Sequence, residues 1–291
     1  MQISRRSLLS AASFAPAMGL VSPGLRVALA AEGSSQNDIL VVIYLRGGSD
    51  GLQMVAPAGD PNYIAARPTI AVPTSGPGAG YGIATHQGVD FFINPDAPEL
   101  RDLFSAGDLA VVHAVGIPNG KRSHFESQDQ MELGVTPDDV MPNDGWLTRH
   151  IAALGGDRPL LGTVASAPNM PISLLGYTSG LAIPEVTTFN VVGGATTAGQ
   201  LRNITSGTSV YKSVATNTLD AIATIQDGLL ATANDPNAQY SGPIGNALKS
   251  LARLIKMDVG LDLATVDHHG WDHHDNLLSE FQDRTVDLSK S

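Results

Sequence analysis

The sequence predicts an α/β fold with a mostly parallel β-sheet flanked by helices. Two continuous apolar runs rich in β-branched residues, Ile39–Leu45 and Leu109–Val115, have the pattern of strands buried on both faces. Segments with helical spacing of apolar residues lie between such runs, and strands that alternate with helices favour parallel pairing. A chain of 291 residues with 31 Gly and 18 Pro suits a large α/β domain with long loops.

The expected elements alternate along the whole chain. The strand Ile39–Leu45 ends in a Gly-rich turn that contains Asp50, and a loop from Gly116 to Arg122 precedes a helix that begins near Ser123. Further helices are expected over Pro98–Ala106, over Ile244–Met257, over Asn276–Leu288 and from Trp146 onwards. Further strands are expected over Leu109–Val115, Leu160–Val164 and Leu261–Val266. Residues 195–240 are expected to be partly helical.

A dense cluster of histidines and aspartates follows the last expected strand. Residues 267–275 read DHHGWDHHD and hold four of the eight histidines. Imidazole and carboxylate groups are ligands of Zn²⁺ and Mn²⁺, and the carboxyl end of a strand is where α/β folds bind ligands. Asp272 and His274 are two residues apart and share one side of an extended chain, so they are the preferred ligands, with His269 and His273 as substitutes. The alternative is a polar loop that is rich in histidine.

Asp50 is a second candidate ligand, because it lies among glycines at the end of the first expected strand. A carboxylate in such a turn can closely approach a metal ion. Aspartate is also common in turns for its own hydrogen bonds to the backbone, and the residues alone leave both interpretations open.

Ser123 is a candidate nucleophile at the start of a helix. Free backbone N–H groups and the positive end of a helix favour an anion such as phosphate or sulfate, and Lys121, Arg122 and His124 add positive charge there. The alternative is a capping box formed by Ser123 and Glu126, which by itself explains this serine. Capping and catalysis are compatible.

The amino-terminal residues 1–30 are predicted to be a twin-arginine signal peptide. Arg5 and Arg6 precede a weakly apolar stretch, and Ala28-Leu29-Ala30 has the pattern of a cleavage site. We therefore expect the twin-arginine translocase as a partner during export, and a periplasmic or secreted product that consists of residues 31–291. An amphipathic first helix is the alternative.

Composition excludes several classes of protein. Residues 1–30 hold three of the 17 Lys and Arg residues and none of the 28 acidic ones, so the mature chain has a formal charge of −14. This charge disfavours binding to nucleic acid and to anionic membranes. The absence of cysteine excludes disulfides and thiolate sites, and no apolar run after the signal approaches the ~20 residues that span a bilayer.

Five separated motifs resemble the DUF1501 family, whose biochemical role is largely unassigned. They are Tyr44–Leu52 (YLRGGSDGL), Arg67-Pro68, Lys121–Gln128 (KRSHFESQ), Asp144–Leu147 (DGWL) and Gly270–His274 (GWDHH). That family is grouped with the alkaline phosphatase superfamily, which includes sulfatases, phosphopentomutases and cofactor-independent phosphoglycerate mutases. The resemblance implies an alkaline-phosphatase-like fold in which Asp50 is a metal ligand, Ser123 the nucleophile, and Asp272 with His274 a later ligand pair.

The chain departs from the family pattern in two ways. It has Asp-His-His at 272–274 where the family commonly has Asp-Thr-His, and it stops at Ser291, before two further motifs that the family uses for metal ligands. We therefore expect a carboxy-terminally truncated chain with an incomplete two-metal site. The function that the resemblance implies is a metal-dependent hydrolase or transferase of phosphate or sulfate esters whose substrate is unknown. The alternative is a non-catalytic periplasmic binding or assembly protein that retains the fold.

Overall fold

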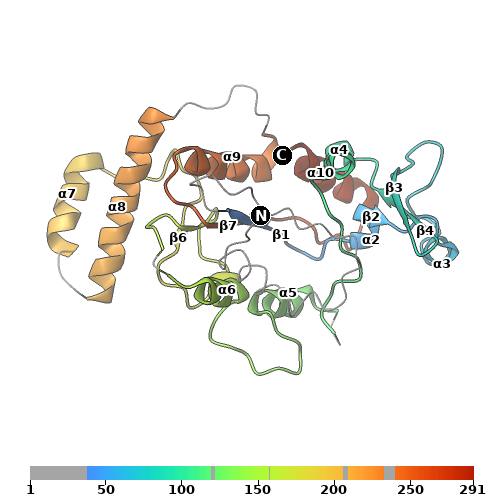
Figure 1. Cartoon of the computed structure of the whole chain (residues 1–291), viewed down its shortest axis with the longest axis horizontal. Helices are drawn as coiled ribbons and strands as arrows, with labels where there is room; N and C mark the ends of the chain where they lie inside the picture. The colour runs from blue at the N-terminus through green and yellow to red at the C-terminus, as the bar shows by residue number, and fades with distance from the viewer. Residues whose placement is uncertain (1–37, 119–121, 157, 206–208, 233–239) are drawn as a thin grey trace, which may run out of the picture.

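The computed structural model describes residues 38–118, 122–156, 158–205, 209–232 and 240–291, shown in Figure 1. A main sheet is built from β1 (Leu40–Leu45), β5 (Thr163–Ala165), β6 (Leu181–Ala182) and β7 (Leu263–His268). The helices around it are α5 (His124–Leu133), α6 (Trp146–Leu154), α8 (Val210–Ala231), α9 (Gly242–Lys256) and α10 (Leu277–Lys290), with a short 3₁₀ helix η2 (Ile172–Leu174) beside α6.

The four strands of the main sheet lie in the order β1-β7-β5-β6, and every neighbouring pair is parallel. Strand β1 pairs with β7 from Leu40↔Leu263 to Leu45↔His268. In Figure 1, α9 and α10 lie on one side of this pair of strands, and α5 and α6 lie on the other. The predicted α/β class, with a parallel sheet flanked by helices, is therefore confirmed, and the carboxyl ends of β1 and β7 lie next to each other.

Alternating side chains of the sheet pack into two separate cores. Ala264 and Val266 of β7 pack in one cluster with Leu251 and Leu254 of α9. Leu263, which points to the opposite face, packs in another cluster with Leu147 of α6. Burial of each such leucine stabilises the fold by about 1.5–3 kcal/mol, which explains why both faces of the sheet carry a helix layer.

A second, antiparallel sheet lies at one end of the molecule, on the right in Figure 1. Its strands β2 (Val55–Ala56), β3 (Tyr81–His86) and β4 (Val89–Ile93) lie in the order β2-β4-β3, and α2 (Gly51–Met54), α3 (Pro61–Ala66) and α4 (Pro98–Ala106) accompany it. The sequence analysis did not anticipate this sheet. The turn between β3 and β4 is formed by Gln87 (φ 52°) and Gly88 (φ 82°), both in the left-handed region that tight hairpins require.

The prediction of a buried strand over Leu109–Val115 is wrong. The segment is irregular, Ala114 has a φ of 56° that an extended strand does not allow, and Val112 and Val115 are about three-quarters exposed. Val111 and His113 pack instead against the small sheet, with the His113 ring centroid 4.5 Å from that of Phe91. An apolar run forms a strand only where it can pair with the edge of a sheet. This run packs against the small antiparallel sheet without pairing with it, and it does not join the sheet that contains β1.

The other expected elements are present with small shifts of their ends. Helix α4 spans the predicted residues, while β1, β5, β7, α5, α6, α9 and α10 begin or end within a few residues of the expected positions. The partly helical structure expected over 195–240 corresponds to α7 (Gly194–Thr205) and α8. No helix in the described part of the chain has the length and apolarity to cross a membrane. The predicted signal peptide, residues 1–30, lies outside the described residues.

Candidate functional site

The loops that follow β1 and β7 are held together by backbone contacts. The Arg46 N–H donates to the His268 carbonyl at 2.8 Å, and the Trp271 N–H donates to the Arg46 carbonyl at 3.0 Å. Gly47 then adopts a φ of 120°, and a Cβ at this position would lie 2.4 Å from the Asp272 nitrogen. Only glycine therefore permits so close an approach, which places Asp272 directly against the turn after β1.

Trp271 anchors the histidine-rich loop in the core. Its side chain is fully buried and makes edge contacts with His268 and Phe281, both with ring centroids 5.3 Å away. The His273 ring also lies on Phe281, at 5.7 Å. His268 is buried as well, and its Nε2 lies 3.1 Å from an Asp287 carboxylate oxygen on α10. These contacts turn His268 and His273 towards the protein interior.

Three side chains that could hold a metal ion meet at the carboxyl edge of the sheet. His274 Nε2 lies 2.8 Å from one carboxylate oxygen of Asp272, and His124 Nε2 lies 3.3 Å from the other. The potential ligand atoms of these residues all lie within 4.8 Å of one another. The His124 side chain is 21% exposed and that of His274 76%, so the group opens to solvent on one side. The arrangement offers two imidazoles and a carboxylate, a common ligand set of Zn²⁺.

Helix α5, which begins with His124, is fixed to the sheet by a buried ion-pair network. Arg46 contacts Glu132 of α5 at 2.5 Å and Asp267 of β7 at 3.0 Å. Burial alone would lower the pKa of the Arg46 guanidinium, but its hydrogen bonds to both carboxylates raise that pKa above its usual value. Burial has the opposite effect on Tyr44 and is the main cause that raises the pKa of this phenol. The Arg46 guanidinium carbon lies 4.2 Å from the centroid of the Tyr44 ring. The arginine of the YLRGGSDGL motif therefore has a structural role.

Ser123 occupies the N-cap position of α5, but its side chain makes no capping hydrogen bond. The capping box expected for Ser123 and Glu126 is therefore not formed through the serine hydroxyl, although the helix begins there as predicted. Because the Leu109–Val115 segment is not a strand, Ser123 does not follow a strand of the sheet. It stands next to His124 in the chain, with exposed Arg122 before it, and Lys121 lies outside the described residues.

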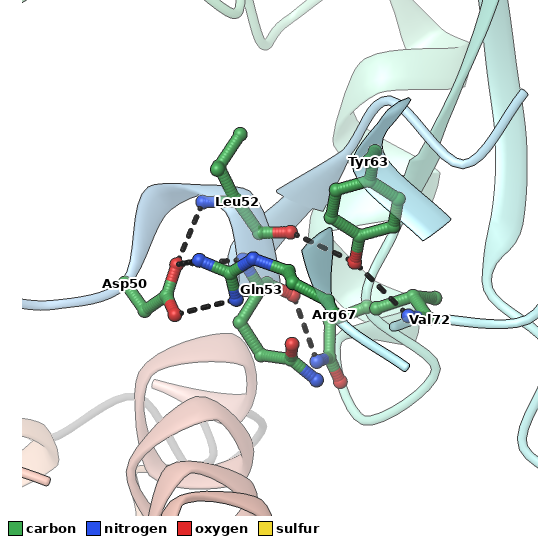
Figure 2. Close-up of polar contacts among 7 residues, drawn as sticks. Asp50, Leu52, Gln53, Tyr63, Arg67 and Val72 are labelled. Atoms are coloured by element: carbon green, nitrogen blue, oxygen red, sulfur yellow. Dashed lines mark hydrogen bonds and ion pairs between the residues drawn. The ribbon is translucent and has the colours of Figure 1, made fainter. Parts of the chain in front are cut away.

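Asp50 lies in the predicted turn, and its carboxylate is occupied by other contacts. It caps α2 by accepting hydrogen bonds from the Leu52 and Gln53 N–H groups, and it forms a bidentate ion pair with Arg67 at 2.7 and 3.0 Å (Figure 2). The contacts of Asp50 therefore agree with the interpretation in which an aspartate in a turn bonds to the backbone. It also explains the Arg67-Pro68 motif, because the arginine of that motif is the partner of Asp50.

The structure thus brings together a subset of the predicted site residues. Asp272 and His274 form the predicted pair, whereas His269 is exposed and His273 packs against Phe281. His124 was assigned to an anion site from the sequence, and its proximity to Asp272 was missed. No spacing in the sequence signals this proximity. In the structure, the turn after β1 contacts both α5 and the histidine-rich loop: a Cβ at Gly48 would lie 3.8 Å from the His124 Cβ, and a Cβ at Gly47 would lie 2.4 Å from the Asp272 nitrogen.

Comparison of the chain with known protein families, with curated proteins and with solved structures finds no match.

Proposed function

We propose that the mature chain is an exported protein that binds one divalent metal ion, Zn²⁺ or Mn²⁺, through His124, Asp272 and His274. The observation that carries this proposal is the convergence of these side chains, from α5 and from the loop after β7, with their ligand atoms within 4.8 Å. Nitrogen and oxygen donors in this ratio suit both ions. Three protein ligands leave coordination positions for water or a substrate, as in catalytic zinc sites.

A single ion fits the described residues better than the two-metal site that resemblance to the DUF1501 family implies. Asp50 is the carboxylate that the resemblance assigns to the metal, and its two oxygens already accept hydrogen bonds from Arg67 and from two backbone N–H groups. Releasing them would leave the Arg67 guanidinium, whose side chain is 18% exposed, without its partner. We therefore assign Asp50 to the support of the turn.

For a reaction, we propose the hydrolysis or transfer of phosphate or sulfate esters with Ser123 as the nucleophile. Its hydroxyl is not used in capping. The amino-terminal end of a helix favours an anionic group such as an ester oxygen, and a serine hydroxyl can act as a nucleophile. Arg122 adds positive charge beside it. A bound divalent ion would neutralise charge on the ester oxygens. The serine oxygen would lose its proton and form the new bond to phosphorus or sulfur while the bond from that atom to the ester oxygen breaks, and the alcohol would leave with a proton. Water in hydrolysis, or another alcohol in transfer, would then displace the serine oxygen and regenerate its hydroxyl.

The metal-binding proposal is tested by calorimetric titration of the mature chain, residues 31–291, with Zn²⁺ and Mn²⁺. Single replacements His124→Ala, Asp272→Ala and His274→Ala should each weaken binding at least about tenfold, because each removes one of three ligands. His269→Ala is the matched control, since this exposed histidine belongs to the same loop but not to the group. Equal affinity in His269→Ala and in the three ligand variants would exclude the site.

The catalytic proposal is tested separately, with aryl phosphate and aryl sulfate esters. Ser123→Ala should abolish turnover while it leaves metal affinity unchanged, because the serine is not among the proposed ligands. Turnover that survives Ser123→Ala with the metal retained would remove this serine as the nucleophile.

A metal-binding protein without catalysis is the second candidate, and the occupied carboxylate of Asp50 favours it. Two-metal ester hydrolases stabilise both the attacking and the leaving oxygen with metal ions. Metal binding without turnover of either ester class by the wild-type chain would select this second candidate.

A further inference from the structure

The outer edge of β1 is open. Strand β1 is the first in the order β1-β7-β5-β6, so β7 is its neighbour on one side and no described strand lies on the other. Its bonds to β7 begin at the Leu40 N–H, which donates to the Asp262 carbonyl at 2.9 Å. Alternate residues of a parallel strand bond to the same neighbour. The N–H and C=O groups of Val41, Ile43 and Leu45 therefore face away from β7.

These edge groups have no partner within the described ranges of the chain. No hydrogen bond between described residues uses the backbone N–H or C=O of Val41, Ile43 or Leu45. Ile43 is 37% exposed, and the other residues of β1 are half-buried. A row of unpaired N–H and C=O groups on an exposed edge is a template for a further strand, because an extended backbone supplies donors and acceptors at the same spacing.

The amino-acid sequence of β1 does not protect this edge. Natural edge strands are blocked by charged side chains, by proline or by bulges, whereas Leu40–Leu45 (LVVIYL) contains no charged residue, proline or glycine. Such a continuous apolar run is typical of a strand inside a sheet. The Tyr44 hydroxyl donates to the Met131 sulfur at 3.7 Å, and Met131 is 50% exposed, so apolar surface continues from the strand onto α5. The edge is therefore suited to pairing with another apolar strand.

We propose that β1 pairs antiparallel with β1 of a second copy of this chain, about a twofold axis at Ile43. The free positions 41, 43 and 45 are symmetric about Ile43. In this pairing Ile43 faces its own counterpart, and Val41 of each copy faces Leu45 of the other. Each facing pair exchanges an N–H···O=C bond in both directions, so every free edge group of both copies finds a partner.

The symmetry of the edge favours a second copy over an unrelated chain. A twofold interface requires one surface that is complementary to itself, and the spacing of the free groups about Ile43 meets that requirement. No charged side chain lies within β1, so the net negative charge of the chain does not create a like-charge contact between the two strands. The pairing uses the β1 edge of both copies, so the assembly closes at two. The inference does not rest on the proposed metal site.

The test is sedimentation velocity of the mature chain over a range of concentrations, in EDTA to exclude association through metal ions. We expect a reversible equilibrium between monomer and dimer. Ile43→Lys places two like charges opposite each other at the axis and should weaken the dimer at least about tenfold. Val192→Lys is the matched control, because Val192 is 94% exposed and lies outside β1.

Three outcomes of sedimentation overturn the proposal. A wild-type chain that stays monomeric at every soluble concentration would leave the edge to another occupant. Equal dissociation constants for Ile43→Lys and Val192→Lys would place the interface elsewhere. Assemblies larger than a dimer would contradict a contact that closes at two.

Cross-linking locates the contact without the lysine variant. The chain has no cysteine, so Ile43→Cys introduces a single thiol. The two Cα atoms of such a facing pair lie about 5.5 Å apart, within reach of a short bis-maleimide. We expect a covalent dimer from Ile43→Cys, whereas Val192→Cys should remain monomeric on a denaturing gel. Equal cross-linking yields from the two cysteine variants would also overturn the proposal.

Discussion

The four histidines of residues 267–275 have the same side chain but different surroundings. His268 is buried against Asp287, His273 packs on Phe281, His274 contacts Asp272, and His269 is exposed. The anchoring of Trp271 in the core sets these directions, because it fixes the backbone in the middle of the cluster. The number of metal ligands in a histidine-rich loop therefore depends on how the loop is anchored more than on its composition.

His268 links the stability of the fold to pH. Burial is the main cause that lowers its pKa below the ordinary value, and it outweighs the opposing effect of Asp287. The hydrogen bonds agree with a neutral ring: Nε2 can donate to Asp287, while Nδ1 is buried without a partner and would become an unpaired donor if it were protonated.

A neutral His268 should make the protein less stable in mild acid. With its pKa lowered in the folded state, the unfolded chain binds more protons below about pH 6.5, so the free energy of unfolding falls as the pH decreases through that value. His268→Gln keeps a donor for Asp287 and should reduce this dependence. Chemical denaturation in EDTA between about pH 7 and pH 5 measures it.

His269→Gln is the control for this measurement, because His269 is exposed in the neighbouring position. An unchanged pH dependence in His268→Gln would show that the buried imidazole does not contribute to the acid sensitivity.

At the scale of elements, the turn after β1 links the sheet to the candidate site. Gly47→Ala should lower the free energy of unfolding by about 1–3 kcal/mol, because alanine disfavours a positive φ. It should also weaken metal binding, because the added Cβ would displace the Asp272 backbone, only 2.4 Å away. Denaturation and calorimetry on the same variant measure both effects.

The hairpin between β3 and β4 supplies the matched control for Gly47. Gly88 also has a positive φ, 82°, but a Cβ there would meet no atom within 4 Å. Gly88→Ala should therefore lower stability and leave metal affinity unchanged. Equal metal affinity in the two alanine variants would contradict the prediction that the turn after β1 positions Asp272 for metal binding.

β7 could be predicted from the sequence because its environment matches its composition: it lies between helix layers, shifted by two residues from the expected run. β1 begins within one residue of its expected start, but it is the first strand in the order β1-β7-β5-β6 and none of its residues is fully buried, so the expected burial on both faces is wrong for this strand. In the small sheet at the end of the molecule, strand β2 is buried, but it is only two residues long. In strands β3 and β4 of the same sheet, partial exposure removes the continuous apolar pattern. The Leu109–Val115 run has that pattern without the environment, because pairing depends on distant segments that local sequence does not specify.

The same limit applies to the site. Asp272 and His274 could be paired from their spacing alone, because both lie in one loop. His124 lies nearly 150 positions earlier in the chain, and it reaches Asp272 through the anchoring of α5 by Glu132 and Arg46. Arg67 removes Asp50 from the ligand set through an ion pair across 17 positions, which spacing did not reveal either.

At the scale of the whole molecule, the remaining prediction concerns the route of the chain out of the cytoplasm. The twin-arginine pathway carries folded proteins, so a metal site assembled from α5 and from the loop after β7 would form before export. Replacement of both Arg5 and Arg6 by Lys should retain the precursor in the cytoplasm, whereas the wild-type chain should accumulate in the periplasm with Ala31 as its first residue. Cell fractionation and amino-terminal sequencing measure these outcomes. Arg26→Lys is the control, because this arginine lies in the same segment but outside the pair. Periplasmic accumulation of the double-lysine variant at the wild-type level would contradict the predicted signal.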